Sequence, residues 1–256
     1  MKLDRRYVEK PWGRTDLPPM FDAPPGKRIG EVWFTGGAEE PLLVKYLFTS
    51  EPLSIQVHPN DEQARARGFA HGKSECWTIL DAEPGATLGL GLKRPTSDQE
   101  LRAAALDGSI EHLMSWRPVR TRDFFMVPSG TIHAIGAGIS LLEFQQNSDL
   151  TYRLYDFGRP RELHIDAAVA VASREPYAEA LRQQVSSDEE RILVDGPDFI
   201  LIHASRDALS DRLRWVMPLE GTAQSTREIA GPGECLLVKP DETVAVDGRV
   251  LIGAKA

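Results

Sequence analysis

The stretch LSIQVHPND, residues 53–61, alternates apolar and polar side chains and ends in turn-forming residues. In a β-strand, residues two positions apart share a face, so the apolar residues point one way and Ser54, Gln56 and His58 point the other. This polar face can belong to an edge strand in contact with water. It can also face inward, because a β-barrel is able to turn such a face toward a lined cavity.

The same period of two recurs along the chain in short segments separated by turn residues. These segments are PLLVKYLF (41–48), ECWTIL (75–80), FFMVPSGTIHAI (124–135), ISLLEFQQ (139–146) and LTYRLYDF (150–157). The pattern predicts a mainly antiparallel β protein. A helical insertion is predicted over 96–116, where Ser97 and Glu100 have the spacing of a capping box, and a shorter helix after Asp166.

Length and composition limit the class of protein. With 256 residues and 41% apolar residues, the chain can form one large β domain or two small ones. A net charge of −8 argues against binding to nucleic acid, which is held by clustered lysine and arginine. Two cysteines, no long apolar stretch and no leader-like N-terminus predict a cytoplasmic protein without a disulfide framework or a membrane span.

A polar segment divides the strand-rich chain. The predicted units are a metal-binding catalytic domain at 1–172, a connection at 173–190 and a C-terminal β domain at 191–256. When the chain is aligned with itself at an offset of 112, Pro128 falls on Pro240 and His133 falls on Ala245. We therefore expect the C-terminal domain to repeat the architecture of the first without its metal ligands, although chance can also produce this weak repeat.

Three residues of metal-ligand type lie on predicted strands that are well separated in sequence: His58, Glu75 and His133. Imidazole and carboxylate together suit a divalent transition metal, and the amide oxygen of Gln56 can complete the set. The set does not distinguish zinc from manganese, iron(II) or cobalt. Taken one at a time, such residues are more often ordinary hydrogen-bonded polar groups.

Two cationic residues share predicted strands with these candidates. Lys73 lies on the same face as Glu75, and Arg153 lies on the less apolar face of LTYRLY. A guanidinium group binds phosphate or an oxyanion well, so Arg153 is a candidate for either. A structural salt bridge is an equally good interpretation of Arg153. Its possible partners are Glu143, Asp149 and Asp156.

Four motifs in order resemble those of the type I mannose-6-phosphate isomerases, a cupin family, and most closely its shorter bacterial members. The motifs are PLLVKYLFTSEPLSIQVHPND, GKSECW, VPSGTIHAIG and EFQQNSDLTYRLYDFGRPRELH, and the resemblance covers about residues 5–170. It implies a cupin (jelly-roll) barrel with a short helical insertion, followed by a second, smaller β-barrel-like domain.

The resemblance also implies one Zn²⁺ ion per chain, with other divalent metals as alternatives. Its ligands would be Gln56, His58, Glu75 and His133. Arg153 would lie near C1 and C2 of a sugar phosphate. Either Lys73, with a pKa depressed by burial and a nearby cation, or a metal-bound water would move the proton.

Lys45 and Arg159 are further candidates for substrate contact by this resemblance. Lys45 has an alternative role as a snorkelling side chain on a barrel strand, and Arg159 and Arg161 lie in a probable loop where a solvated surface is the ordinary expectation. The implied reaction interconverts mannose 6-phosphate and fructose 6-phosphate through a cis-enediol.

Two other functions fit the same residues. A non-catalytic cupin could keep the metal and bind a sugar or sugar phosphate as a sensor, but it would need neither Lys73 nor Arg153. An iron-dependent oxygenase would more naturally present two histidines and one carboxylate, without the amide and the arginine motif. The short chain also leaves open whether the sugar is phosphorylated or free.

Overall fold

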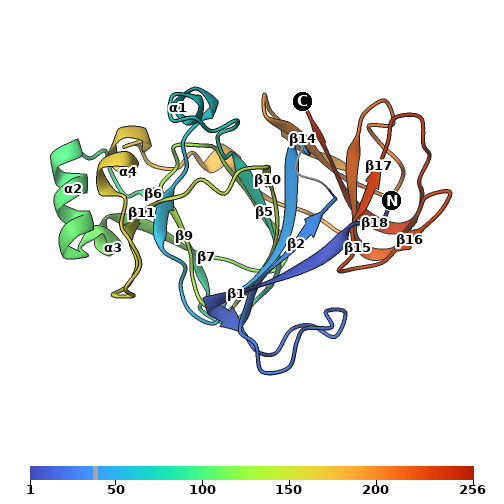
Figure 1. The fold of residues 1–256 in the computed structure, drawn as a ribbon, viewed down its shortest axis with the longest axis horizontal. Coiled ribbons are helices and arrows are strands. Elements are labelled where there is room, and N and C mark those ends of the chain that lie inside the picture. Colours follow the sequence, from blue (N-terminus) through green and yellow to red (C-terminus); the bar gives the residue numbers. More distant parts are fainter. Residues whose placement is uncertain (37–39) are drawn as a thin grey trace.

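The computed structural model describes residues 1–36 and 40–256 and shows a mainly β protein, as predicted. Its strands form three antiparallel sheets (Figure 1). The C-terminal sheet lies at one end of the molecule and the helices lie at the other, with the sheet that begins at the N-terminus between them. No helix in these two ranges has the length and apolar character needed to cross a membrane.

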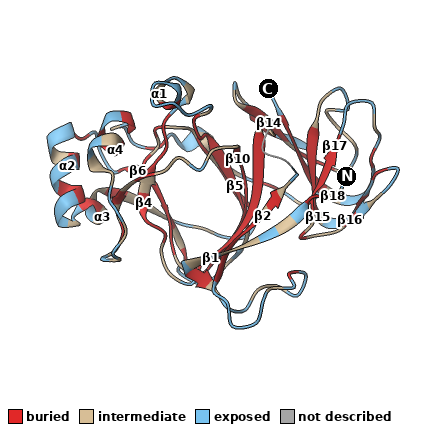
Figure 2. Cartoon of the chain, viewed as in Figure 1, coloured by how far each residue is buried: buried red, intermediate tan, exposed pale blue. Residues whose placement is uncertain are grey.

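Two sheets pack face to face and form the barrel. The first has the order β1 (Asp4–Arg14), β2 (Ile29–Thr35), β3 (Leu42–Phe48), β10 (Ile139–Gln146), β5 (Glu75–Ala82), β8 (Asp123–Val127) and β12 (Arg182–Gln184). The second has the order β11 (Tyr152–Tyr155), β4 (Ile55–Val57), β9 (His133–Ile135), β6 (Thr87–Leu92) and β7 (Met114–Pro118). Between them lies an apolar core that includes Trp77, Phe125 and Leu141 from the first sheet and Leu88 and Ile135 from the second. The side chains between the two sheets are buried, and β3 and β10 are buried along their whole length because their outer face is covered as well (Figure 2).

The helices α2 (Asp98–Asp107), α3 (Ile110–Leu113) and α4 (Ile165–Val171) cover the outer face of the second sheet and share one apolar core with it (Figure 1). The short helix α1 (Asp61–Arg65) lies apart from them and follows β4 (Figure 1). Ser97 caps α2 by accepting a hydrogen bond from the Glu100 amide at 3.1 Å, but the Glu100 carboxylate binds Arg94, so only this half of the predicted capping box forms. The predicted end of this helical segment at residue 116 is wrong, because Asp107 is the last residue of α2. Gly108 breaks it in the left-handed region with φ 82°, and Met114 begins a strand that pairs with β6.

The C-terminal sheet packs on the outer face of the first sheet. Its order is β13 (Arg191–Asp195), β14 (Phe199–Ala204), β18 (Ala245–Lys255), β15 (Arg214–Gln224) and β16 (Ile229–Ala230), and β17 (Leu236–Val238) pairs with β15. One apolar core joins it to the first sheet, and a second core lies on its other face. The predicted connection at 173–190 contains β12, which pairs with β8. Because the core is continuous, the division at 172 and 190 stays a prediction.

Gly253 lets β18 approach β10 at this contact between sheets. A Cβ atom there would lie 2.5 Å from Cε1 of Phe144, whereas a Cβ at the control position Gly196 would meet no atom closer than 3.6 Å. Gly253→Ala is therefore expected to lower the free energy of unfolding by about 1–3 kcal/mol through overpacking. Gly196→Ala should leave it within about 0.5 kcal/mol of the parent value. Urea denaturation measures both, and equal stabilities would contradict the close contact.

Candidate metal centre and active-site cavity

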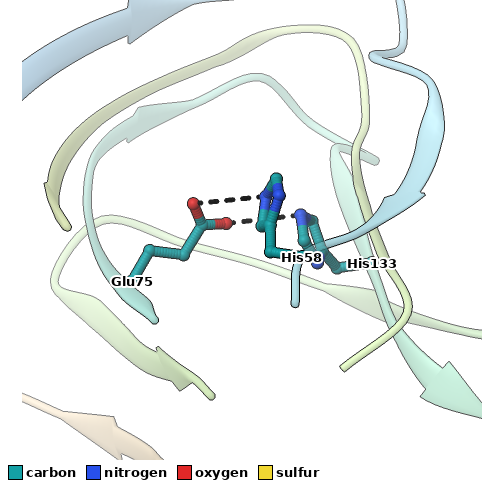
Figure 3. Close-up of side chains that lie close together, drawn as sticks. All are labelled: His58, Glu75 and His133. Atoms are coloured by element: carbon teal, nitrogen blue, oxygen red, sulfur yellow. Dashed lines mark ion pairs between the residues drawn. The ribbon is translucent and has the colours of Figure 1, made fainter. Parts of the chain in front are cut away.

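Three strand ends of the barrel bring His58, Glu75 and His133 together (Figure 3). His58 directly follows β4, Glu75 begins β5 and His133 begins β9. One possible ligand atom from each residue lies within 4.8 Å of the other two, and all three side chains are buried. Gln56 on β4 is the cross-strand partner of His133. The structure thus places all four predicted ligands at one corner of the barrel interior.

Hydrogen bonds fix the orientation of both histidine rings. Nδ1 of His58 lies 2.9 Å from the Leu150 carbonyl oxygen, and Nδ1 of His133 lies 2.9 Å from the Thr131 carbonyl oxygen. A carbonyl only accepts, so each Nδ1 carries the proton and each Nε2 presents a lone pair. These lone pairs lie 3.6 Å and 3.3 Å from the oxygens of Glu75.

Burial keeps both rings neutral. It lowers the pKa of His58 well below its usual value, with help from the nearby charge of Lys73, and lowers the pKa of His133 to about 4. Burial also raises the pKa of the Glu75 carboxyl to about 7, against the opposing effect of Lys73. Neutral imidazoles are the form that binds metal, and proton binding does not compete at His133 near neutral pH.

This donor set fits a divalent transition metal. Two imidazole lone pairs face the buried carboxylate of Glu75, with their Nε2 atoms 3.6 Å and 3.3 Å from its oxygens. Neutral imidazole nitrogens and a carboxylate oxygen that converge in this way are donors typical of such metals. The carbonyls that hold the Nδ1 protons are the outer partners that metal-binding histidines ordinarily have.

Gln56 lies at the same corner and can supply a fourth donor. Its Nε2 is 3.3 Å from Nε2 of His133, and its Oε1 accepts a hydrogen bond from Ser54 Oγ at 3.0 Å. The two ends of an amide are distinguished only by their hydrogen bonds, and Ser54 Oγ can accept as well as donate. The amide can therefore present its oxygen to the shared corner.

A cavity of about 470 Å³ opens beside this corner. Its walls include ten charged or amide side chains: Lys10, Glu31, Lys45, Gln56, Lys73, Glu75, Glu143, Asp149, Arg153 and Arg161. A volume of this size holds a small polar ligand. Its chemistry is therefore set by buried charges that lie close to the candidate ligands.

Lys73 contacts the metal corner directly. Its Nζ lies 2.6 Å from Oε2 of Glu75, 3.2 Å from Nε2 of His58 and 4.0 Å from Oε1 of Glu143. Burial acts to lower the pKa of Lys73, but Glu75 and Glu143 outweigh it and raise that pKa above its usual value. The predicted depression of this pKa therefore depends on a bound cation, because the charges of the chain itself act in the opposite direction. Lys73 is held as an ammonium group.

Glu143 is a cavity residue that the sequence pattern did not identify as functional. It is 3% exposed on β10, its Oε1 lies 3.1 Å from Nζ of Lys45, and its Oε2 accepts a 3.0 Å hydrogen bond from Nε1 of Trp77. Burial opposes ionisation, but Lys45 and Lys73 lower the pKa of Glu143 to about 2. Lys45 is 4% exposed, so its side chain does not snorkel to solvent.

Arg153 lines the cavity beside Gln56, which is its cross-strand partner on the neighbouring strand β4. Its Nε is buried without a hydrogen-bond partner, and no ion pair joins it to a carboxylate among the residues that the structure describes. Burial lowers the pKa of Arg153, and Arg161 adds to this effect. The proposed salt bridge to Glu143, Asp149 or Asp156 is therefore not formed.

His164 and Arg159 both lie near this end of the cavity, but only one of them lines it. His164, which was not among the candidates from the sequence, lines the cavity, and its Nδ1 accepts a 3.3 Å hydrogen bond from the backbone amide of Arg153. Arg159 does not line the cavity, because Asp156 and the Pro52 carbonyl hold its guanidinium elsewhere. A contact from Arg159 to substrate thus has no support in the geometry.

Comparison with known proteins gives consistent relatives, although no protein-family model matches the chain. It is 42% identical over 167 residues to a mannose-6-phosphate isomerase of Streptococcus mutans, covering 62% of this chain and 52% of that protein. It is 37% identical over 206 residues to the mannose-6-phosphate isomerase ManA of Bacillus subtilis, covering 64% and 65%. The chain thus spans between half and two thirds of the length of these curated relatives.

A solved structure extends the likeness to the whole fold. The mannose 6-phosphate isomerase from Bacillus subtilis superposes with a TM-score of 0.82 at 27% identity, covering 98% of each chain. Because it covers 98% of this chain, the match includes the C-terminal sheet, whereas the sequence alignments cover 62% and 64% of the chain. The resemblance noted in the sequence, and the mainly β cupin architecture that it implied, are therefore confirmed.

Proposed function

We propose that the chain is a metal-dependent aldose–ketose isomerase of the type I mannose-6-phosphate isomerase family, which interconverts mannose 6-phosphate and fructose 6-phosphate. One observation carries this proposal. The cavity beside the His58–Glu75–His133 corner holds an ionised carboxylate and an ammonium group, Glu143 and Lys73, 4.0 Å apart. A binding module would need the metal ligands and a cationic contact, but not a proton acceptor and a proton donor beside them.

We further propose that one Zn²⁺ per chain is held by Gln56, His58, Glu75 and His133. Two neutral imidazoles with a carboxylate and an amide oxygen suit zinc, while manganese, iron(II) and cobalt are compatible with the same donors. When bound, the metal would act as a Lewis acid toward the oxygens on C1 and C2 of the sugar. Glu75 would then serve as a ligand and leave proton transfer to other groups.

The charges in the cavity support the following proton-transfer roles. The Glu143 carboxylate accepts the proton from C2 as the cis-enediol forms and returns it to C1, so no net proton is gained or lost. The Lys73 ammonium donates to the oxygen on which negative charge develops and recovers its proton when the carbonyl re-forms. Arg153 supplies fixed positive charge at the same oxygens. Lys45 keeps Glu143 ionised when no substrate is present.

Glu143→Gln tests this assignment. The substitution keeps the shape but removes the proton acceptor, so kcat for mannose 6-phosphate is expected to fall about 10²-fold or more. Metal content should stay at the parent level, since Glu143 is not among the three clustered ligand residues. As a matched control, Glu31→Gln removes another carboxylate on the cavity wall, which lies beside Lys10. Glu31→Gln should lower kcat for mannose 6-phosphate much less than Glu143→Gln does. A Glu143→Gln enzyme with near-parent kcat would refute the role.

The function itself is tested by incubating purified, metal-loaded protein with mannose 6-phosphate, free mannose and glucose 6-phosphate and measuring ketose. We expect fructose 6-phosphate from mannose 6-phosphate. The sensor alternative predicts saturable binding of the sugar phosphate with no ketose from any of the three sugars. That result would replace the isomerase proposal, because the metal site alone does not require turnover.

A further inference from the structure

Two arginines share one buried carboxylate beside the cavity. Asp156, which follows β11 and is 2% exposed, accepts hydrogen bonds from both Arg159 and Arg161. Arg159 is fully engaged: its Nε and Nη2 donate to Asp156, Nη2 also donates to the Pro52 carbonyl at 2.6 Å, and Nη1 lies 3.5 Å from Glu51. This arginine does not reach the cavity wall.

Arg161 is held differently. Its Nε and Nη2 donate to the two oxygens of Asp156 at 2.6 Å and 2.7 Å, which fixes the plane of the guanidinium. No hydrogen bond or ion pair in the described residues engages its Nη1, and Arg161 lines the cavity. The same carboxylate therefore ties one arginine away from the cavity and presents the free edge of the other to it.

The cavity wall differs in charge between the end near Lys10 and the end near Arg153 and Arg161. Lys10 is compensated by Glu31, whose Oε2 lies 3.2 Å from the lysine Nζ. Arg153 has no carboxylate partner in the described part of the chain, and Arg161 shares its single carboxylate with Arg159. Asp149 also lines this end of the cavity, but no ion pair in the described residues joins it to Arg153 or Arg161, so both guanidinium groups keep a donor edge free for a ligand. An anionic group prefers such a site, and guanidinium groups match the geometry of phosphate.

We propose that Arg161, oriented by Asp156, binds the phosphate group of the substrate and so sets the preference for phosphorylated over free sugar. This inference rests on the proposed function for the identity of the substrate. Arg153 is the cross-strand partner of Gln56, one of the proposed metal ligands. In this arrangement, the reacting carbons of the sugar lie between the metal and Arg153, and the phosphate lies at Arg161. Asp156 acts as a positioning residue and does not touch the sugar.

The test compares two arginines tied to the same carboxylate. Arg161→Gln is expected to raise KM for mannose 6-phosphate about 10- to 100-fold, because charge-assisted hydrogen bonds to phosphate are lost. Its kcat should change less than about threefold, since binding that is equal in ground and transition states affects KM alone. The matched control Arg159→Gln should keep the parent KM. Equal KM values for Arg161→Gln and the parent would overturn the proposal, as would a rise confined to Arg159→Gln.

A binding measurement separates this inference from the proposed reaction. Calorimetry on the metal-loaded protein gives dissociation constants for mannose 6-phosphate and for free mannose without requiring turnover. We expect Arg161→Gln to weaken binding of the phosphorylated sugar and to leave that of mannose unchanged. If no ketose forms but this difference is found, the isomerase proposal fails and the phosphate assignment stands. If both sugars lose affinity equally, the assignment fails whatever the activity.

Asp156 supplies an independent readout of positioning. Asp156→Asn removes the charge that orients both guanidinium groups, so it should raise KM for mannose 6-phosphate in the same direction as Arg161→Gln. In the double variant with Arg161→Gln, it should add little further increase, because the two residues act on one contact. Fully additive effects would show that Asp156 acts on the fold alone and would contradict its role through Arg161.

Discussion

Replacing His133 with alanine is expected to remove both the bound cation and the turnover. The histidine contributes one of two imidazole lone pairs in a buried three-residue cluster, with its Nε2 3.3 Å from Glu75. Without it, only one nitrogen donor and the carboxylate remain beside Gln56. Transition metals of this class need three or four protein donors for tight binding. The Lewis acid and the orientation of the sugar oxygens would therefore be lost together.

Metal analysis and an isomerase assay on the same preparations measure this effect. The control is His112→Ala, which removes an exposed histidine in α3 and should keep both the metal and the activity. We expect the parent and the control to carry one equivalent of metal and His133→Ala to carry almost none, with activity below detection. A His133→Ala protein that keeps its metal would show that the ion is bound elsewhere.

Arg153→Ala is expected to separate metal binding from catalysis. Arg153 is not a metal-ligand type, so the metal content should remain at the parent level. Arg153 is the cross-strand neighbour of Gln56, no carboxylate among the described residues pairs with its guanidinium, and its buried Nε is free to donate. Losing a preorganised donor at a developing oxyanion costs about 10²–10³-fold in kcat, and a full positive charge belongs at the upper end of that range.

Arg67→Ala provides the control for Arg153. Arg67 is exposed and stacks on the ring of Tyr152, the neighbour of Arg153 in β11, so its removal tests whether disturbing the strand is enough to reduce activity. We expect Arg67→Ala to keep near-parent kcat. If Arg153→Ala retained near-parent kcat, its place at the reacting oxygens would be wrong. If Arg153→Ala lost its metal, the loss of activity would follow from the missing metal and not from the missing guanidinium.

The alternation of side chains along the strands predicted much of the candidate metal site. Period-two patterns placed Gln56 and His58 on one face and joined Lys73 to Glu75, and the structure brings these residues and His133 together. This worked because the side-chain period of a strand is fixed by backbone geometry. The start of α2 was also predictable, because Ser97 satisfies a backbone amide that the helix leaves unpaired.

Contacts between strands that are distant in sequence were not predictable in the same way. Glu143 meets Lys45 and Trp77 only because β10 lies between β3 and β5 in the first sheet. Parity says which face a residue occupies but not which strand lies beside it. For the same reason, the sequence pattern did not show that Glu143 helps to raise the pKa of Lys73, whereas the contribution of Glu75, two residues away, comes from the same strand face.

The roles of the arginines were also hidden in the sequence. Arg159 and Arg161 are two residues apart in one loop, and nothing in composition separates them. The structure distinguishes them through Asp156, the Pro52 carbonyl and the cavity wall. Loop conformation depends on such particular hydrogen bonds, which have no period that a sequence pattern can reveal.

Anomalous diffraction from crystals of the metal-loaded protein tests the central claim most directly. The account predicts one strong peak per chain at the absorption edge of the bound metal, about 2.0–2.2 Å from Nε2 of His58, Nε2 of His133 and a carboxylate oxygen of Glu75. A peak at any other place in the chain, or stoichiometric metal with these three side chains left uncoordinated, would contradict it.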